Sequence, residues 1–203
     1  MIRVKQNQGE KSLRKKLLQI LSAVDRDFLP PLSQRRSLEF WMTLFEKGVI
    51  LYAVEEDSVA GFLAYYPSLS GEIFNDLQSC VNINPMISSA NTHKMFQGAY
   101  LHYIAIAPEY RRRKIASALM TELLVDAQRK GISRLRVITW STNNASLKLY
   151  LKHGFSIFNR IANDRGKGVD SVYLEVKIPS LQSPIDKSGI NYFHKTTVSG
   201  ESI

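Results

Sequence analysis

The segment from residue 99 to residue 140 constrains the fold most, because it predicts a strand, a helix and a second strand in close succession. The run AYLHYIAIA is a β-type stretch that ends at Pro108. Residues 113–130 then place apolar side chains on one helical stripe, and Gly131 ends that helix. The run RLRVITW (134–140) is typical of a buried strand. This order predicts a right-handed crossover between two parallel strands.

The segments on either side of this unit predict further strands and helices. Before this unit, two segments show the helical spacing of apolar residues, and they are followed by a pair of β-type runs joined by a turn. After the unit come a short helix and a closing antiparallel pair of strands. The predicted helices are 11–24, 33–47 and 143–153, and the predicted strands are 49–55, 59–66, 155–161 and 169–178. Strands that alternate with helices in this way predict an α/β domain on a mixed sheet.

Residues 1–178 are predicted to form this domain, and two segments differ from it in composition. Residues 67–98 are polar and irregular and form a long inserted loop, in which we expect a short helix near residues 72–79. Residues 179–203 form a polar tail, which could contact the domain or a second subunit. A homodimer is therefore possible.

Cysteine content and hydropathy predict a soluble, cytoplasmic protein. The single cysteine, Cys80, cannot form an internal disulfide. The first residues lack the apolar core of a signal peptide, and no apolar run has the length of a membrane span. We also find no pair of residues with the spacing of metal ligands. Neither a membrane nor a metal is expected.

The net charge of +9 is concentrated near the start of the 113–130 helix. Between Arg111 and Arg136 there are eight Lys or Arg residues against two Asp or Glu residues. A helix amino terminus that follows a strand attracts phosphate oxygens, and ligands of open α/β sheets lie beyond the carboxyl ends of the strands. The alternatives are an ordinary solvated basic face and a nucleic-acid-binding surface. The second lacks interleaved aromatic residues, so no nucleic acid is expected.

Two motifs in register resemble those of the GNAT acetyltransferase superfamily. The segment APEYRRRKIASA resembles its Arg/Gln-x-x-Gly-x-Gly/Ala motif, with Arg111 at the first position, Ala116 at the last, and Lys114 where the family has glycine. The segment NNASLKLYLKHGF resembles the Asn-x-x-Ala-x-x-Leu-Tyr-x-x-x-Gly-Phe helix, with Ser146 in place of the alanine. The resemblance covers roughly residues 1–178.

This resemblance implies a fold, a co-substrate and a reaction. The fold would be a mostly antiparallel central sheet with one parallel crossover at the cofactor site and helices on both faces. The protein would be an N-acetyltransferase that moves an acetyl group from acetyl-CoA, without a metal, to a small-molecule or peptide amine by direct attack. Two alternatives stay open, namely a non-catalytic CoA-binding sensor on the same fold and a basic nucleic-acid-binding domain.

The resemblance also implies where acetyl-CoA binds. Backbone groups of one strand would pair with the pantetheine arm, and the following turn and helix start would wrap the pyrophosphate. Asn143 would lie near the arm and Tyr150 near the sulfur. The implied cofactor residues are Ile104, Ala105, Ile106, Arg111, Arg112, Arg113, Lys114, Ile115, Ala116, Ser117, Asn143 and Tyr150.

Three side chains are candidates for the chemistry. Tyr150 would donate a hydrogen bond to the leaving thiolate, although an aromatic residue at helical spacing is also typical of a core. Tyr100 and His102 are two residues apart on a strand, so they share a face, and either could relay the proton of the amine. Histidine titrates near neutral pH, which makes His102 the better candidate for the base. Either residue could instead have only a structural role.

Overall fold

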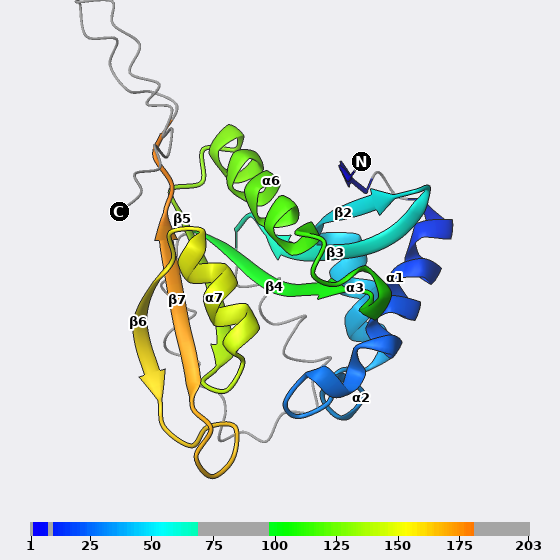
Figure 1. The fold of residues 1–203 in the computed structure, drawn as a ribbon. Helices are drawn as coiled ribbons and strands as arrows, with labels where there is room; N and C mark the ends of the chain where they lie inside the picture. Colours follow the sequence, from blue (N-terminus) through cyan, green and yellow to red (C-terminus); the bar gives the residue numbers. More distant parts are fainter. Residues whose placement is uncertain (1, 8–9, 69–97, 181–203) are drawn as a thin grey trace, which may run out of the picture.

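The computed structural model describes residues 2–7, 10–68 and 98–180 (Figure 1). Its strands form one sheet in the order β1-β2-β3-β4-β5-β7-β6, in which only β4 and β5 pair in parallel. The expected mixed, mostly antiparallel sheet with one parallel crossover is confirmed. The strands are β1 Arg3–Gln6, β2 Val49–Glu55, β3 Ser58–Tyr66, β4 Ala99–Ile106, β5 Arg134–Trp140, β6 Ser156–Ile161 and β7 Ser171–Lys177.

Helices cover both faces of the sheet and enclose two hydrophobic cores (Figure 1). On one face, α1 (Lys11–Ala23), α2 (Leu32–Arg35) and α3 (Leu38–Lys47) pack over β2, β3 and β4. On the other face, α6 (Ile115–Arg129) and α7 (Asn144–Lys152) pack over the centre of the sheet and over β5 and β7. The short 3₁₀ segments η1 (Asp25–Asp27) and η3 (Pro108–Tyr110) belong to the connections.

The helix expected over residues 33–47 is two helices, so that part of the prediction is wrong. Arg36 has extended backbone angles and interrupts the helix. The hydroxyl of Ser37 then caps α3 by accepting a hydrogen bond from the Phe40 N–H at 3.1 Å. A good capping residue inside a helical pattern starts a new helix here, and Arg36 is turned toward the sheet as a result.

Strand β4 contains one residue more than its neighbour β3 needs. Ala64 of β3 pairs with Tyr103, whereas Tyr65 pairs with Leu101, so His102 is the extra residue of a β-bulge. Leu101 packs in the core beneath α6, while Tyr103 packs in the core beneath α3. The bulge therefore puts His102 and Tyr103 on the same face of the sheet, together with Tyr100.

Strands β4 and β5 pair over a short distance only. Ala99–Leu101 pair with Leu135–Val137, but β4 continues to Ile106 and β5 to Trp140 without further pairing between them. On the side that faces β5, the backbone groups at the end of β4 have no strand partner among the described residues. An extended ligand could therefore bind there as an added strand does.

Two predicted segments lie outside the described residues. They are most of the 67–98 loop, with the short helix expected near residues 72–79, and the tail beyond residue 180.

Candidate functional site

The connection from β4 to α6 forms a turn at residues 111–114, here named the basic turn. Arg112 and Lys114 adopt the left-handed conformation, with φ of 61° and 63°. This conformation costs an ordinary residue roughly 1–2 kcal/mol, and glycine adopts it freely. Lys114 stands where the resemblance expects glycine, and its backbone has the conformation for which glycine is suited. The substitution therefore changes the side chain and keeps the course of the chain.

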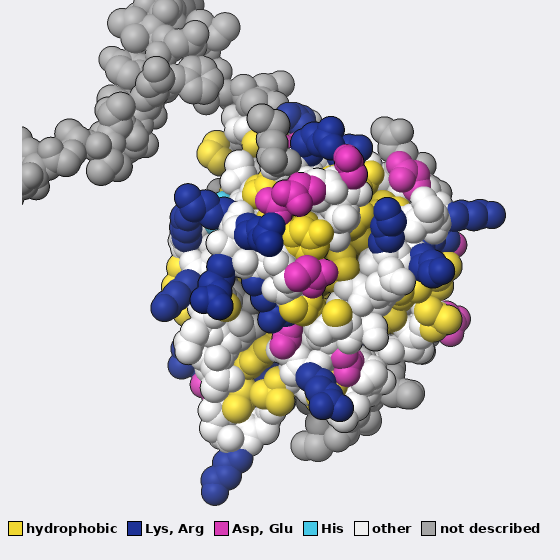
Figure 2. All heavy atoms as spheres, turned by 45° about the vertical axis from the view of Figure 1, so that its right-hand side comes forward, with side chains coloured by type: hydrophobic (Ala, Val, Ile, Leu, Met, Phe, Trp, Pro, Cys, Tyr) yellow, Lys and Arg dark blue, Asp and Glu magenta, His cyan; other side chains and the backbone are white. Residues whose placement is uncertain are grey.

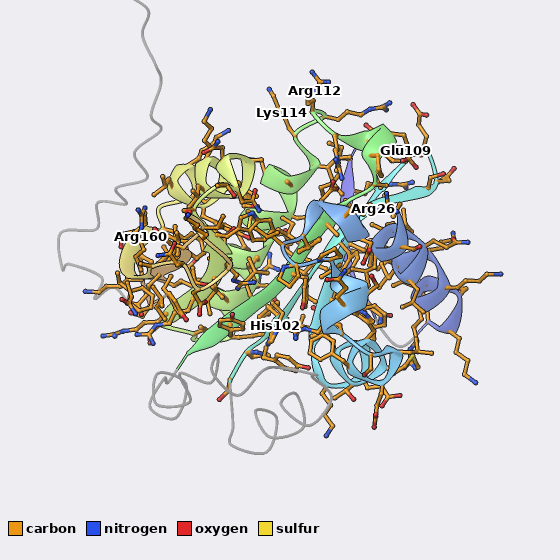
Figure 3. The ribbon with its side chains drawn as sticks, turned by 90° about the horizontal axis from the view of Figure 1, so that it is seen from below. Arg26, His102, Glu109, Arg112, Lys114 and Arg160 are labelled. Carbon is orange, nitrogen blue, oxygen red and sulfur yellow. The ribbon has the colours of Figure 1, made fainter. Side chains whose placement is uncertain are left out.

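The four cations of the basic turn differ in their partners. Arg111 forms an ion pair with Asp27 and donates from Nε to the Ile106 carbonyl at 3.4 Å. Arg113 pairs with Glu55 at 3.1 Å. Arg112 and Lys114 form no ion pair with any described residue, and Figure 3 shows both projecting outward. Arg112 and Lys114 are thus the cations available to an anionic ligand.

The first turn of α6 follows at once. Its first backbone hydrogen bond runs from the Ala118 N–H to the Lys114 carbonyl, so the N–H groups of Ile115, Ala116 and Ser117 precede it. The side chain of Lys114 does not cap them. These N–H groups and the helix dipole are suited to phosphate oxygens.

Ser117 also contacts a residue that the sequence did not single out. Its hydroxyl lies 2.9 Å from Nε2 of His153, which follows α7. Burial and the neighbouring Lys152 lower the pKa of His153, so the imidazole is neutral at physiological pH. This contact joins the start of α6 to the end of α7.

The three strand residues expected to line the cofactor lie at the end of β4. Ile104 and Ile106 are half-buried on the α6 side of the sheet, and Ala105 is buried on the other side. Opposite them, a β-carbon at Gly61 would lie 2.8 Å from the Ala105 carbonyl oxygen and 2.5 Å from an Ile106 methyl carbon. Only glycine at this place lets β3 approach the end of β4 so closely.

Asn143 and Tyr150 belong to α7. Asn143 caps the helix, since its Oδ1 accepts a hydrogen bond from the Ser146 N–H at 3.1 Å. Tyr150 is buried, and its ring lies 5.6 Å from that of Phe155. Burial raises the pKa of the Tyr150 hydroxyl, and a hydrogen bond with the Ser146 side chain opposes this. Tyr150 therefore stays protonated and can donate a hydrogen bond.

His102 lies on the other face of the sheet, apart from the basic turn (Figure 3). A connected set of rings surrounds it, here named the aromatic face. Its ring centroid is 4.6 Å from that of Tyr100, 5.2 Å from Tyr66, 6.1 Å from Tyr103 and 6.3 Å from Phe40. The aromatic face comprises Phe28, Phe40, Tyr66, Tyr100, His102, Tyr103 and Trp140.

The Tyr100 hydroxyl and the His102 imidazole differ in their ability to accept a proton. Burial raises its pKa far above the ordinary value of tyrosine, and the positive charges of Arg165 and Arg36 oppose this only in part. A hydroxyl of this kind stays protonated at neutral pH. Tyr100 is therefore suited to hydrogen bonding, and His102 is the better proton acceptor of the two.

Sequence reasoning missed several residues of this region. Phe28 follows η1, and its ring lies 5.9 Å from Tyr103 of β4 and 6.0 Å from Trp140 of β5, so it spans the two diverging strands. Arg36 donates from Nε to the Tyr103 hydroxyl at 2.7 Å. Arg165 comes from the loop between β6 and β7. These residues are far apart in the sequence, and no local pattern indicates that they meet.

Two further observations concern binding partners. Among the residues that the structure describes, no group of three or more His, Cys, Asp or Glu side chains could hold a metal ion, and no described helix is long and apolar enough to cross a membrane. Figure 2 shows basic, acidic and apolar side chains together on one side of the molecule.

Comparison with known proteins concerns both the sequence and the fold. Residues 15–155 match the profile described as "Acetyltransferase (GNAT) family". The ribosomal protein bS18-alanine N-acetyltransferase of Escherichia coli K12 is 29% identical over 91 residues, which are 45% of this chain and 61% of that protein's length.

Solved structures are similar over nearly the whole described chain. The crystal structure of the ribosomal-protein-S18-alanine N-acetyltransferase from Escherichia coli has a TM-score of 0.60 at 16% identity, and the match covers 90% of this chain and 97% of that chain. A GNAT family acetyltransferase from Elizabethkingia anophelis, solved with acetyl-CoA bound, has a TM-score of 0.55 at 16% identity, over 87% and 97% of the two chains. These matches show the fold.

Proposed function

Because the chain belongs to the GNAT acetyltransferase family, we propose that it transfers an acetyl group from acetyl-CoA to an amine. The observation that carries this proposal is the glycine-like course of the basic turn. Lys114 holds a left-handed conformation at the start of α6, in the connection that leads there from the unpaired end of β4. The uncapped N–H groups of α6 and the backbone of Ile104–Ile106 then form one continuous edge for a long anionic ligand.

Each part of acetyl-CoA has a place along this edge. The pyrophosphate would accept hydrogen bonds from the first turn of α6, and Arg112 and Lys114 would supply positive charge. The pantetheine arm would follow residues 104–106, with Asn143 on its other side, and its sulfur would lie near Tyr150. A relative of the same fold from Elizabethkingia anophelis was solved with acetyl-CoA bound, which supports this assignment.

The reaction would be a direct attack. The nitrogen lone pair of the amine attacks the thioester carbonyl carbon, the carbon–sulfur bond breaks, and the electron pair leaves with the CoA sulfur. His102 accepts the proton that the amine loses. The protonated Tyr150 hydroxyl donates a hydrogen bond to the sulfur as its negative charge develops. Tyr100, protonated beside His102, holds the histidine or the amine by hydrogen bonding.

The acceptor is an amine, on a small molecule or a peptide. The curated relative of Escherichia coli acts on the alanine of a ribosomal protein, which supports a peptide amino terminus as one candidate. A cytoplasmic location and a homodimer stay predictions from the sequence.

The decisive experiment is mass spectrometry of the products after incubation with acetyl-CoA and an amine library, with thiol release as a parallel readout. An added mass of one acetyl group on an amine, with a matching amount of free CoA, is the expected result. A thermal melt with acetyl-CoA separates the alternatives, because a ligand at a hundred times its Kd adds about 2.7 kcal/mol of stability. A sensor would be stabilised without releasing thiol, and a melt that acetyl-CoA leaves unmoved would contradict both readings.

A further inference from the structure

Arg165 is a half-buried cation whose described partners are all neutral. Its Nε donates to the Ser171 hydroxyl at 2.9 Å, and its Nη1 donates to the Leu29 carbonyl at 3.2 Å. No described carboxylate lies within ion-pair distance of it. Its neighbour Asp164 accepts a hydrogen bond from Ser171 instead. The guanidinium is thus held in one orientation, with no direct ion pair to a described carboxylate.

A second guanidinium, that of Arg36, contacts the aromatic face directly. Arg36, between α2 and α3, donates to the Tyr103 hydroxyl at 2.7 Å, and its Cζ lies 4.7 Å from the centre of the Phe40 ring. Both contacts are with the aromatic face. Arg36 was turned toward the sheet by the break between the two helices, so its position depends on the cap at Ser37.

Contacts with the aromatic face bring the two cations into one region. Arg165 donates to the carbonyl of Leu29, which follows Phe28, and to Ser171, which pairs with Trp140 of β5. The Phe28 ring lies 5.9 Å from that of Tyr103, whose hydroxyl accepts the hydrogen bond of Arg36. The positive charges of both arginines also lower the pKa of the Tyr100 hydroxyl, which burial raises. The ring of Tyr100 is also 4.6 Å from the ring of His102. Two cations and several tyrosine hydroxyls therefore border the place at which the proposed base acts.

We propose that this group recognises an oxyanion on the acceptor, a carboxylate or a phosphate ester, with Arg165 and Arg36 as its specificity-determining residues. The inference rests on the proposed function, because it concerns the amine that His102 deprotonates. Guanidinium groups bind carboxylates and phosphates in a planar, two-pronged manner, and the Tyr100 hydroxyl adds a donor that stays protonated because burial raises its pKa. Phe28 and Trp140 would cover the apolar part of such a molecule.

The test compares amines that differ only in the anionic group. Phenylalanine is compared with phenethylamine for the carboxylate, and phosphoethanolamine with ethanolamine for the phosphate, each kcat/KM being expressed per deprotonated amine. In at least one pair we expect the anionic member to be preferred by about tenfold or more, because hydrogen bonds to a charged group discriminate on that scale. The preferred pair identifies the kind of oxyanion.

Variants then assign the preference to the two arginines. Arg165→Gln and Arg36→Gln should each reduce the preference to about twofold, and Arg165→Lys, which keeps the charge without the planar fork, should give an intermediate ratio. Arg160→Gln is the matched control, since Arg160 is an exposed arginine of β6 that pairs with Asp170. The preference of the Arg160→Gln variant for the anionic amine should equal that of the unmodified protein.

The outcomes separate the two proposals. Acetylation of both members of each pair at equal rates, or faster acetylation of the neutral ones, would overturn the anion recognition and leave the transferase assignment standing. Failure of every amine to release thiol, in these pairs and in the amine library alike, would overturn the proposed function and this inference with it. Since the comparison of amines uses the unmodified protein, it holds even if an arginine variant fails to fold.

Discussion

The basic turn and the aromatic face are built in opposite ways. The turn and the start of α6 form one uninterrupted stretch, residues 111–117, whose shape is set mainly by its backbone conformation. The aromatic face takes its side chains from the residue after η1 and from α3, β3, β4 and β5, and Arg36 and Arg165 reach it from two further loops. A site made of neighbouring residues can change its side chains and keep its shape. A site made of distant residues depends on the whole fold for its geometry.

His102→Gln tests the aromatic face and should have the largest effect. Glutamine can hydrogen-bond but cannot take up a proton, so kcat should fall by about a hundredfold. Any dependence of kcat on the protonation state of the His102 side chain should disappear with it. The Kd of acetyl-CoA, measured by calorimetry, should be nearly unchanged. His153→Gln is the matched control and should keep the pH profile of kcat; a variant at His102 with the original profile would show that another group is the base.

Tyr150→Phe tests whether the cofactor side extends to α7. Loss of the hydrogen bond to the leaving sulfur should lower kcat by about tenfold to a hundredfold, while acetyl-CoA binding stays nearly intact. The buried ring and its contact with Phe155 are kept. Tyr110→Phe, at the half-buried tyrosine that lies beneath Arg113, serves as the control. Equal turnover in both variants would leave Tyr150 with a packing role only.

Lys114→Gly separates backbone from side chain in the basic turn. Relief of the left-handed conformation should raise the free energy of unfolding by about 1 kcal/mol and Tm by about 2–4 °C. Loss of the charge should weaken CoA binding by about two- to fivefold at low salt, with little difference at high salt. Arg112→Gly is the control, because Arg112 is equally exposed and also left-handed. Its Tm should rise similarly, and a larger loss of affinity there than at Lys114 would assign the phosphate contact to Arg112.

His153→Gln should have the smallest effect, on the pH dependence of stability. The folded protein keeps His153 neutral because its pKa is lowered, whereas the unfolded chain takes up a proton below about pH 6.5. The unfolded state therefore binds more protons, and this contribution to stability is present above that pH and is lost as the pH falls. Urea midpoints at pH 7 and at pH 5.5 should differ less in the variant than in the unmodified protein. An unchanged difference would show that other groups cause it.

The same contrast explains what could be predicted from the sequence. Local patterns were enough for the crossover unit, the basic turn and the two motif helices, since Gly131 and the apolar stripe of α6 lie within a few residues of each other. Strand β1 was missed because Arg3–Gln6 is short and mostly exposed, without an apolar alternation. The break at Arg36 was missed because serine and arginine both occur within helices. The meeting of Phe28, Arg36 and Arg165 depends on tertiary packing, which no short pattern contains.

The bulge in β4 gives His102 an unusual place in the architecture. Tyr100–Leu101 and Tyr103–Ile106 pair with β3 on either side of it. His102 and Tyr103 lie on the same face of the sheet, so deleting one of these two residues would leave every other side chain of β4 on its present face, whereas a deletion elsewhere in the strand would shift a register or turn part of the strand over. The histidine proposed to carry the proton is thus one of two adjacent residues of which the sheet itself requires only one, and the chemistry of this protein could be gained or lost there without rebuilding the fold.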